Sequence, residues 1–119
     1  MYNFFLLLFL SLAVKHFIVD FVLQSQDEID HKGTYLDFRG VKHSVKHGLL
    51  TVLVFWLFDM HFIGAWILGS IDFLIHYHID FIKMKFGTKD MTKKRFWYEF
   101  GADQLAHYIT YIYLIWITL

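Results

Sequence analysis

Apolar residues dominate four segments of the chain, and polar stretches separate these segments. The apolar segments cover residues 3–24, 41–58, 62–84 and 100–119. Each is close to the ~20 residues with which a helix crosses a bilayer at about 1.5 Å per residue. Residues 109–119 carry no charge and show no amphipathic period, which a surface helix of a soluble protein would show. The pattern predicts an all-α fold, an integral membrane four-helix bundle forming a single domain over residues 1–119.

The polar connections orient these four predicted helices. Residues 26–40 and 85–99 are rich in charge, and a tight turn at 59–61 joins the two middle helices. Of the 11 Lys and Arg residues, all but Lys15 lie in the two charged connections or at the helix ends beside them. By the positive-inside rule, both connections are cytoplasmic and both termini are external. We therefore expect a multi-pass protein of a bacterial inner membrane.

Every predicted helix carries His or Asp residues four positions apart, which fall on one helix face. Each pair lies near the cytoplasmic end of its helix, so the antiparallel helices would place all pairs in one layer of the cytoplasmic leaflet. This polar layer comprises His16, Asp20, His43, His47, His76, Asp80, Asp103 and His107. A charged residue deep in a membrane helix costs ~2.5–3.5 kcal/mol, so these side chains must face one another, water or a cation.

The composition of the polar layer is typical of a metal site. Neutral imidazoles and carboxylates suit zinc, manganese or ferrous iron, and the chain has no Cys to select a softer metal. A bound divalent ion would offset the cost of burial, since structural zinc sites contribute on the order of 10–16 kcal/mol. We therefore expect a divalent ion, with zinc as the first choice. The alternative is a set of buried His–Asp hydrogen bonds that only hold the helices together.

Other polar residues near the layer need separate interpretations. Asp72 lies one turn deeper and is either a ligand or a carboxylate that orients His76. His78 is off the shared face of its helix and is expected at a packing or interfacial position. His31 and His61 fall in the connections, where we expect them to be solvated.

Four stretches of the chain together resemble a known family. They are HFIVDFVLQ at His16–Gln24, the His47 position, HYHIDFIK at His76–Lys83, and DQLAH at Asp103–His107. In this order they resemble the small membrane proteins of bacteria and their phages known as domain of unknown function 3307. The resemblance implies a fold and a residue set but no reaction. That set comprises His16, Asp20, Gln24, His47, His76, Asp80, Lys83, Asp103, Gln104 and His107.

The function that we expect is a metal-dependent hydrolase embedded in the membrane. A site in the cytoplasmic leaflet would reach a lipid headgroup or a lipid-linked phosphate, and the metal would polarise the substrate and activate water. Asp20 or Asp103 would act as the general base, and Lys83 would stabilise developing negative charge. Membrane lipids are the expected partners, and a homo-oligomer is compatible with the sequence. The net charge of zero gives no reason to expect nucleic acid.

Two other functions fit the same residues. Intramembrane His and Asp also build proton or metal conduits, although the outer helix halves, such as 4–10 and 109–119, offer almost no polar path. A non-enzymatic phage or bacterial membrane protein would keep the polar layer for structure alone. Metal content separates this structural role from the hydrolase, and a leak assay in liposomes identifies a conduit.

Overall fold

The computed structural model describes residues 2–119, which are mostly helical and contain no strand. The elements are α1 (Tyr2–Phe17), a π-helical turn η1 (Ile18–Val22), α2 (Gln26–His31), α3 (Phe38–Leu57), α4 (Phe62–Phe86) and α5 (Lys94–Trp116). The predicted all-α class is therefore confirmed. Four of the helices are long and correspond to the four apolar segments, whereas α2 has no counterpart in the prediction.

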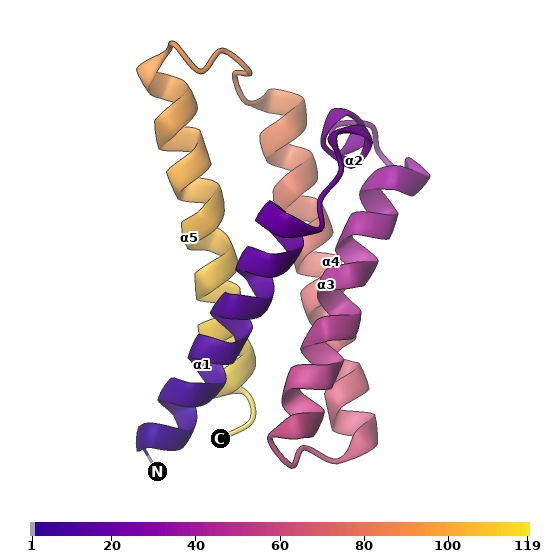
Figure 1. The fold of residues 1–119 in the computed structure, drawn as a ribbon, viewed down its shortest axis with the longest axis vertical. Coiled ribbons are helices and arrows are strands. Elements are labelled where there is room, and N and C mark those ends of the chain that lie inside the picture. Colours follow the sequence, from indigo (N-terminus) through magenta and orange to yellow (C-terminus); the bar gives the residue numbers. More distant parts are fainter. Residues whose placement is uncertain (1) are drawn as a thin grey trace.

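Successive long helices run antiparallel along the longest axis of the molecule, so that α1 and α4 point one way and α3 and α5 the other (Figure 1). Both termini and the α3–α4 turn lie at one end, while α2 and the α4–α5 connection lie at the other. The two charged connections therefore share one end of the bundle, as antiparallel helices require. The molecule measures 44 × 29 × 23 Å, so its long dimension exceeds the ~30 Å hydrocarbon thickness of a bilayer.

Capping residues extend the helices beyond the apolar segments, which corrects several predicted boundaries. Ser25 and Glu28 form a capping box that begins α2: the Glu28 N–H donates to Ser25 Oγ at 3.2 Å, and the Ser25 N–H donates to Glu28 Oε2 at 3.0 Å. Asp37 begins α3 by accepting a hydrogen bond from the Arg39 N–H at 2.9 Å. By contrast, α5 begins at Lys94 within the basic stretch without a side-chain cap. Hydrophobicity alone placed the starts of α3 and α5 too late because the first turn of a helix need not be apolar.

The apolar core occupies the half of the bundle that contains the termini. Its buried members are Leu8, Leu12, Phe55, Ala65, Leu68, Tyr111, Leu114 and Ile115. In the other half, toward the charged connections, the buried side chains are mainly His, Asp and Lys. Burial therefore separates by depth into an apolar part and a polar part.

Two glycines let α3 and α4 approach closely. A Cβ atom on Gly69 would lie 2.6 Å from the Gly48 carbonyl oxygen, and a Cβ on Gly48 would lie 2.8 Å from the Gly69 carbonyl oxygen. Small residues at such a crossing allow backbones to meet, as they often do in membrane helix pairs. The α3–α4 hairpin thus forms a tight frame that carries three of the predicted His ligands.

Two segments are long and apolar enough to cross a membrane, Tyr2–Val22 and Phe62–Phe86. The remaining long helices, α3 and α5, carry more charge and His in their halves near the connections. Core helices of soluble proteins can share the length and composition of the two apolar segments. Length and composition thus support two of the four predicted membrane spans, and four spans remain a prediction.

Candidate metal centre

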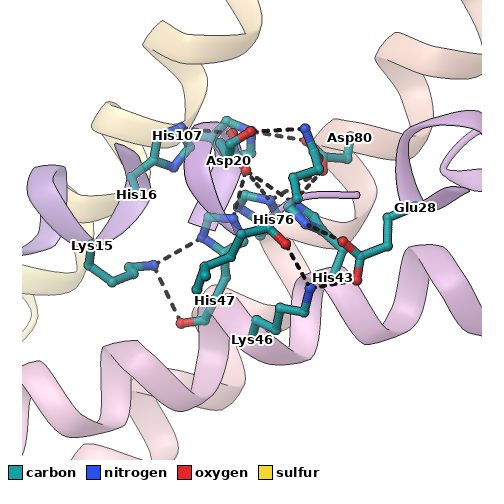
Figure 2. Close-up of polar contacts among 12 residues, drawn as sticks. Lys15, His16, Asp20, Glu28, His43, Lys46, His47, His76, Asp80 and His107 are labelled. Atoms are coloured by element: carbon teal, nitrogen blue, oxygen red, sulfur yellow. Dashed lines mark hydrogen bonds and ion pairs between the residues drawn. The ribbon is translucent and has the colours of Figure 1, made fainter. Parts of the chain in front are cut away.

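The structure brings all eight residues of the polar layer together, and Figure 2 labels all of them except Asp103. They form three overlapping groups, and within each group one ligand atom per residue lies within 4.8 Å of the others. The groups are Asp20–His43–His47–His76, then His16–His76–His107, and then Asp80–Asp103–His107. None of these side chains is exposed: the five His are at most 1% exposed and the three Asp at most 9%. Spacing by four on each helix therefore selected side chains that do lie close together, although it also selected Asp72, which is in none of the three groups.

Asp20 reaches the layer from the π-helical turn η1. The Leu23 N–H donates to the Ile18 carbonyl at 2.9 Å, five residues back rather than four. Such a turn holds one extra residue and changes the direction of the side chains within it; π-turns occur frequently at functional sites. The sequence analysis predicted an ordinary helix here, because no Gly or Pro marks the change.

Histidines from different helices surround Asp20. Its Oδ1 lies 3.0 Å from His43 Nε2 and 2.8 Å from His47 Nε2, both on α3. The same oxygen is 3.9 Å from His76 Nε2 on α4, and Oδ2 is 3.1 Å from His16 Nε2 on α1. Among residues 2–119, the ion-pair contacts of Asp20 are with histidines alone. Asp20 is therefore a buried carboxylate that no Lys or Arg in this range contacts directly.

Asp80 lies on the other side of the same histidines. Its Oδ2 is 3.2 Å from His76 Nε2 and 3.5 Å from His43 Nε2. Its Oδ1 is 3.2 Å from His107 Nε2 on α5. The Lys32 ammonium, from the connection after α2, lies 2.7 Å from Oδ2. Lys32 is a contact that the sequence analysis did not predict, because the residue belongs to a connection rather than to a helix face.

Asp103 completes the layer from α5. Its Oδ1 lies 3.5 Å from His107 Nε2, and its Oδ2 accepts hydrogen bonds from Gln104 Nε2 at 3.0 Å and from Lys83 Nζ at 3.4 Å. Gln104 Oε1 is also 3.0 Å from His16 Nε2. Lys83, predicted to be catalytic, is thus beside the layer and is 24% exposed through its side chain.

Several buried polar atoms of the layer have no hydrogen-bond partner within the described chain. They include both ring nitrogens of His76, Nδ1 of His43 and Oδ1 of Asp103. A buried polar group without a partner costs about 1–3 kcal/mol. A cation at His76 Nε2 and Asp103 Oδ1 would use their lone pairs, whereas Nδ1 of His43 and of His76 would carry the ring proton. Imidazole with carboxylate is a donor set for zinc, manganese or iron. The residues therefore fit the divalent ion predicted from the sequence.

Further contacts orient the histidine rings from behind. Tyr111 Oη lies 2.8 Å from His16 Nδ1, and Lys15 Nζ lies 3.3 Å from His47 Nδ1 (Figure 2). Glu28 Oε2 is 4.0 Å from His43 Nδ1. Residues that hold the second nitrogen of a ligating His fix its ring orientation. None of these three partners was predicted as part of the site.

An ion pair lies one turn deeper than the polar layer. Lys15 Nζ is 2.8 Å from Asp72 Oδ2, and Thr51 Oγ1 donates to the same oxygen at 2.6 Å. Asp72 is therefore neither in a ligand group nor in contact with His76, which were the two expectations for it. The sequence signal for this pair is that Lys15 is the one basic residue inside an apolar helix and Asp72 is an acid at similar depth.

The short helix α2 covers one side of the layer. Glu28 Oε1 accepts a hydrogen bond from Lys46 Nζ on α3 at 2.6 Å, which fastens α2 to the bundle. Burial raises the pKa of the Glu28 carboxyl, but the hydrogen bonds from Lys46 and from the Ser25 N–H outweigh burial and hold the pKa below its ordinary value. Glu28 therefore stays ionised beside His43 at neutral pH.

The three remaining histidines lie outside the layer. His31 and His78 each contact a backbone carbonyl of their own helix, and His61 accepts a hydrogen bond from the Gly64 N–H at the start of α4. His61 and His78 are exposed, and His31 is partly exposed. These positions agree with the sequence analysis, which left all three out of the site.

A cavity of about 710 Å³ leads to the polar layer from the end with the charged connections. Its carboxylates are Asp20, Asp30, Asp80 and Asp103, and its lysines are Lys32, Lys83 and Lys89. Its apolar lining includes Phe21, Met84, Phe96 and Phe100. A cavity with this lining can accept a ligand that has both an anionic group and an apolar part. The layer is therefore buried and yet accessible from one side.

One comparison with known proteins gives a match. The model of a family described as "Protein of unknown function (DUF3307)" matches residues 7–119. This match confirms the resemblance found in the sequence. No curated protein and no solved structure matches the chain.

Proposed function

The chain belongs to the DUF3307 family of unknown function, so we propose a function from its own geometry: a membrane-embedded, metal-dependent hydrolase of lipid or lipid-linked phosphate esters. One observation carries the proposal. The buried layer contains histidine ring nitrogens without hydrogen-bond partners, and its three aspartates line a cavity that also presents lysines and aromatic side chains. Metal ligands, anion-binding groups and apolar walls are thus combined in one place.

The distribution of polar and apolar side chains supports the membrane setting. Outward-facing positions on the long helices are apolar, among them Leu6, Leu10, Leu53, Ile67 and Ile112, while charged groups are buried inside. A soluble protein shows the reverse tendency for charge, and large exposed apolar surfaces mark contact with lipid or with another protein. In the proposed orientation the two charged connections, which hold most of the Lys and Arg residues together with the helix ends beside them, face the cytoplasm of a bacterium, and both termini are external.

We assign the primary ion position to Asp20, His43, His47 and His76. Three imidazoles with one carboxylate are a suitable set for zinc, and manganese or iron would need further oxygen ligands. When bound, a divalent ion would polarise a phosphoryl oxygen as a Lewis acid. It would also lower the pKa of a water molecule bound to it to about 7. Both oxygens of Asp20 face histidines, so Asp20 is assigned as a ligand rather than as the general base.

The cavity residues supply the remaining functions. Asp103 Oδ1 is unpartnered at the layer, and Asp103 lines the cavity, so this carboxylate can take a proton from water that enters there. Lys83 and Lys32 lie at the carboxylates and can bind the phosphate oxygens as point charges. The apolar part of the substrate would lie against Phe96 and Phe100.

Metal content and hydrolysis in purified protein test this proposal. We expect wild-type protein in detergent to contain a divalent ion and to release phosphate from vesicles that carry a lipid phosphate monoester. His76→Ala should lose most of the metal and the activity. Lys83→Ala should keep the metal, since a protonated Lys cannot be a ligand, but should hydrolyse more slowly.

The matched control is His61→Ala, which removes an exposed histidine outside the layer. It should keep both metal and activity. Wild-type protein without divalent metal, whose melting ignores added metal and chelator, contradicts the proposal. Metal-loaded protein that hydrolyses no lipid phosphate contradicts the enzymatic part alone.

A purely structural layer is the second candidate. It is favoured by the ion pairs that match Asp72 with Lys15, Asp80 with Lys32, and Asp103 with Lys83 without any metal. Asp20 is the exception, because only histidines contact its carboxylate in the described chain. Wild-type protein with neither divalent metal nor hydrolytic activity, together with a Lys83→Ala variant that differs little from it in stability, would favour this non-enzymatic role.

A further inference from the structure

The polar layer offers more ligands than one ion needs. Eight buried side chains converge there, whereas a zinc site normally uses four ligands. The eight come from all four long helices and from η1, and none of them is at the surface of the molecule. We infer that the layer is a two-metal centre in which Asp20 and Asp80 bridge the two ions; the inference rests on the proposed metal-dependent function.

Asp20 directs its two carboxylate oxygens to different histidines. Its Oδ1 lies 2.8 Å from His47 Nε2 and 3.0 Å from His43 Nε2. Its Oδ2 lies 3.1 Å from His16 Nε2, on another helix. This division, in which each oxygen faces different histidines, is the arrangement expected of a carboxylate that bridges two ions.

Asp80 is divided in the same way. Its Oδ2 lies 3.2 Å from His76 Nε2 and 3.5 Å from His43 Nε2, while its Oδ1 lies 3.2 Å from His107 Nε2. Each bridging carboxylate therefore presents one oxygen to the α3–α4 histidines and the other to a histidine of α1 or α5. This division defines two ion positions rather than one.

The two positions use different side chains; in the second, His107 lies within one ligand group with His16 and within another with Asp80 and Asp103. The first position comprises His43, His47 and His76 with Oδ1 of Asp20 and Oδ2 of Asp80. The second position comprises His16, His107 and Asp103 with Oδ2 of Asp20 and Oδ1 of Asp80. The His76 and His107 rings stack with centroids 4.1 Å apart, so the positions are adjacent. Ions in two-metal hydrolytic sites are typically about 3.5–4 Å apart.

Charge balance is compatible with two ions. Lys32 and Lys83 pair with Asp80 and Asp103, and both lysines line the cavity. Their ammonium groups are on flexible stems, so they can turn from the carboxylates toward an anion in the cavity when cations bind. The deeper pair of Lys15 with Asp72 does not line the cavity and stays in place. In this arrangement Asp103 would bind the second ion through Oδ1. It would therefore not act as the general base.

Manganese is a suitable probe because its electron paramagnetic resonance spectrum reports whether ions are coupled. Full-length protein is freed of metal, dialysed against Mn²⁺ in detergent, and analysed for manganese per chain and for its spectrum. We expect two ions per chain and a spectrum of an exchange-coupled pair. Asp103→Asn and His47→Ala, which alter the second and first positions, should each halve the manganese content and give the spectrum of an isolated ion. His61→Ala should behave as wild type.

The wild-type result alone decides the inference, even if a variant fails to fold. One ion per chain with an isolated-ion spectrum overturns the two-metal centre and leaves the proposed function standing. Two ions without exchange coupling overturn the carboxylate bridges. If neither Mn²⁺ nor Zn²⁺ binds, both the inference and the proposed function are wrong.

Discussion

At the scale of single residues, the buried lysines of the chain each contact an aspartate. Lys15 and Asp72 are the deepest example, with 3% and 1% of their side chains exposed. Thr51 and Tyr111 hydrogen-bond to this pair, so each charge has more than one polar contact. Breaking a buried ion pair at one partner leaves an uncompensated charge, whereas replacing both partners by apolar residues is often tolerated.

Lys15→Met should therefore lower the free energy of unfolding by about 3–5 kcal/mol, because Asp72 would remain buried without its cation. The double variant Lys15→Met/Asp72→Leu should regain most of this loss. Chemical denaturation of both variants in detergent, followed by helical circular dichroism, measures the difference. A single variant as stable as wild type would show that the pair contributes nothing.

The residues of the site are predictable from sequence to a large extent, but their contacts are not. Spacing by four identifies the helix face and the depth of His16, Asp20 and the other layer residues, because helical periodicity is local. The oxygen of Asp20 that each histidine contacts depends on η1, whose extra residue has no local signal. The contact between Lys32 and Asp80 was not predicted, because the position of Lys32 depends on how α2 packs against the bundle.

At the scale of helices, the close crossing of α3 and α4 sets the geometry of the site. Gly69→Ala should cost about 1–3 kcal/mol, as overpacking does, because the new Cβ would lie 2.6 Å from the Gly48 carbonyl oxygen. Gly101→Ala is the control: nothing lies within 4 Å of its Cβ position on α5. Relative to Gly in a helix, Ala there should be neutral or stabilising by up to about 1 kcal/mol.

Thermal unfolding in one detergent compares these two variants. Equal melting temperatures for Gly69→Ala and Gly101→Ala would contradict the tight crossing. Because His43, His47 and His76 lie on this hairpin, Gly69→Ala should also lower the metal content.

The long helices were predictable from hydrophobicity, whereas α2 depends on hydrogen bonds that stabilise a polar segment. Ser25→Ala removes the oxygen that accepts the Glu28 N–H and should cost about 1 kcal/mol of local stability. Hydrogen exchange of residues 26–31 should then be faster than in wild type, while the exchange of α4 is unchanged. Uniform acceleration across both segments would instead indicate global destabilisation.

At the scale of the whole molecule, both charged connections lie at one end of the bundle. In the proposed topology, a reporter fused after Leu119 is external and a reporter inserted near Lys89 is cytoplasmic. Fusions at these two sites, assayed in a bacterial inner membrane, test the orientation. The opposite result would move the polar layer to the outer leaflet and remove access to cytoplasmic substrates.

Removal of metal should destabilise the entire bundle, because the ligands join all the long helices. A ligand present at 1,000 times its dissociation constant stabilises the folded state by about 4.1 kcal/mol. A chelator should therefore lower the melting temperature of wild-type protein, and it should lower that of His47→Ala by less, because this variant keeps only the second of the two proposed ions. If the chelator shifts both proteins equally, the effect is not due to the site.

The contribution of α5 to the layer has a consequence for the timing of synthesis. Every ligand of the first position lies before residue 81, whereas the second position needs Asp103 and His107 from α5. A chain leaving the ribosome completes its early helices before the last one. The first ion could thus be taken up by a nascent chain, while the second would have to wait for the final helix to dock. A chain truncated after Phe86 would then keep the ligands of the first proposed position alone, and the second position would form only once α5 is present.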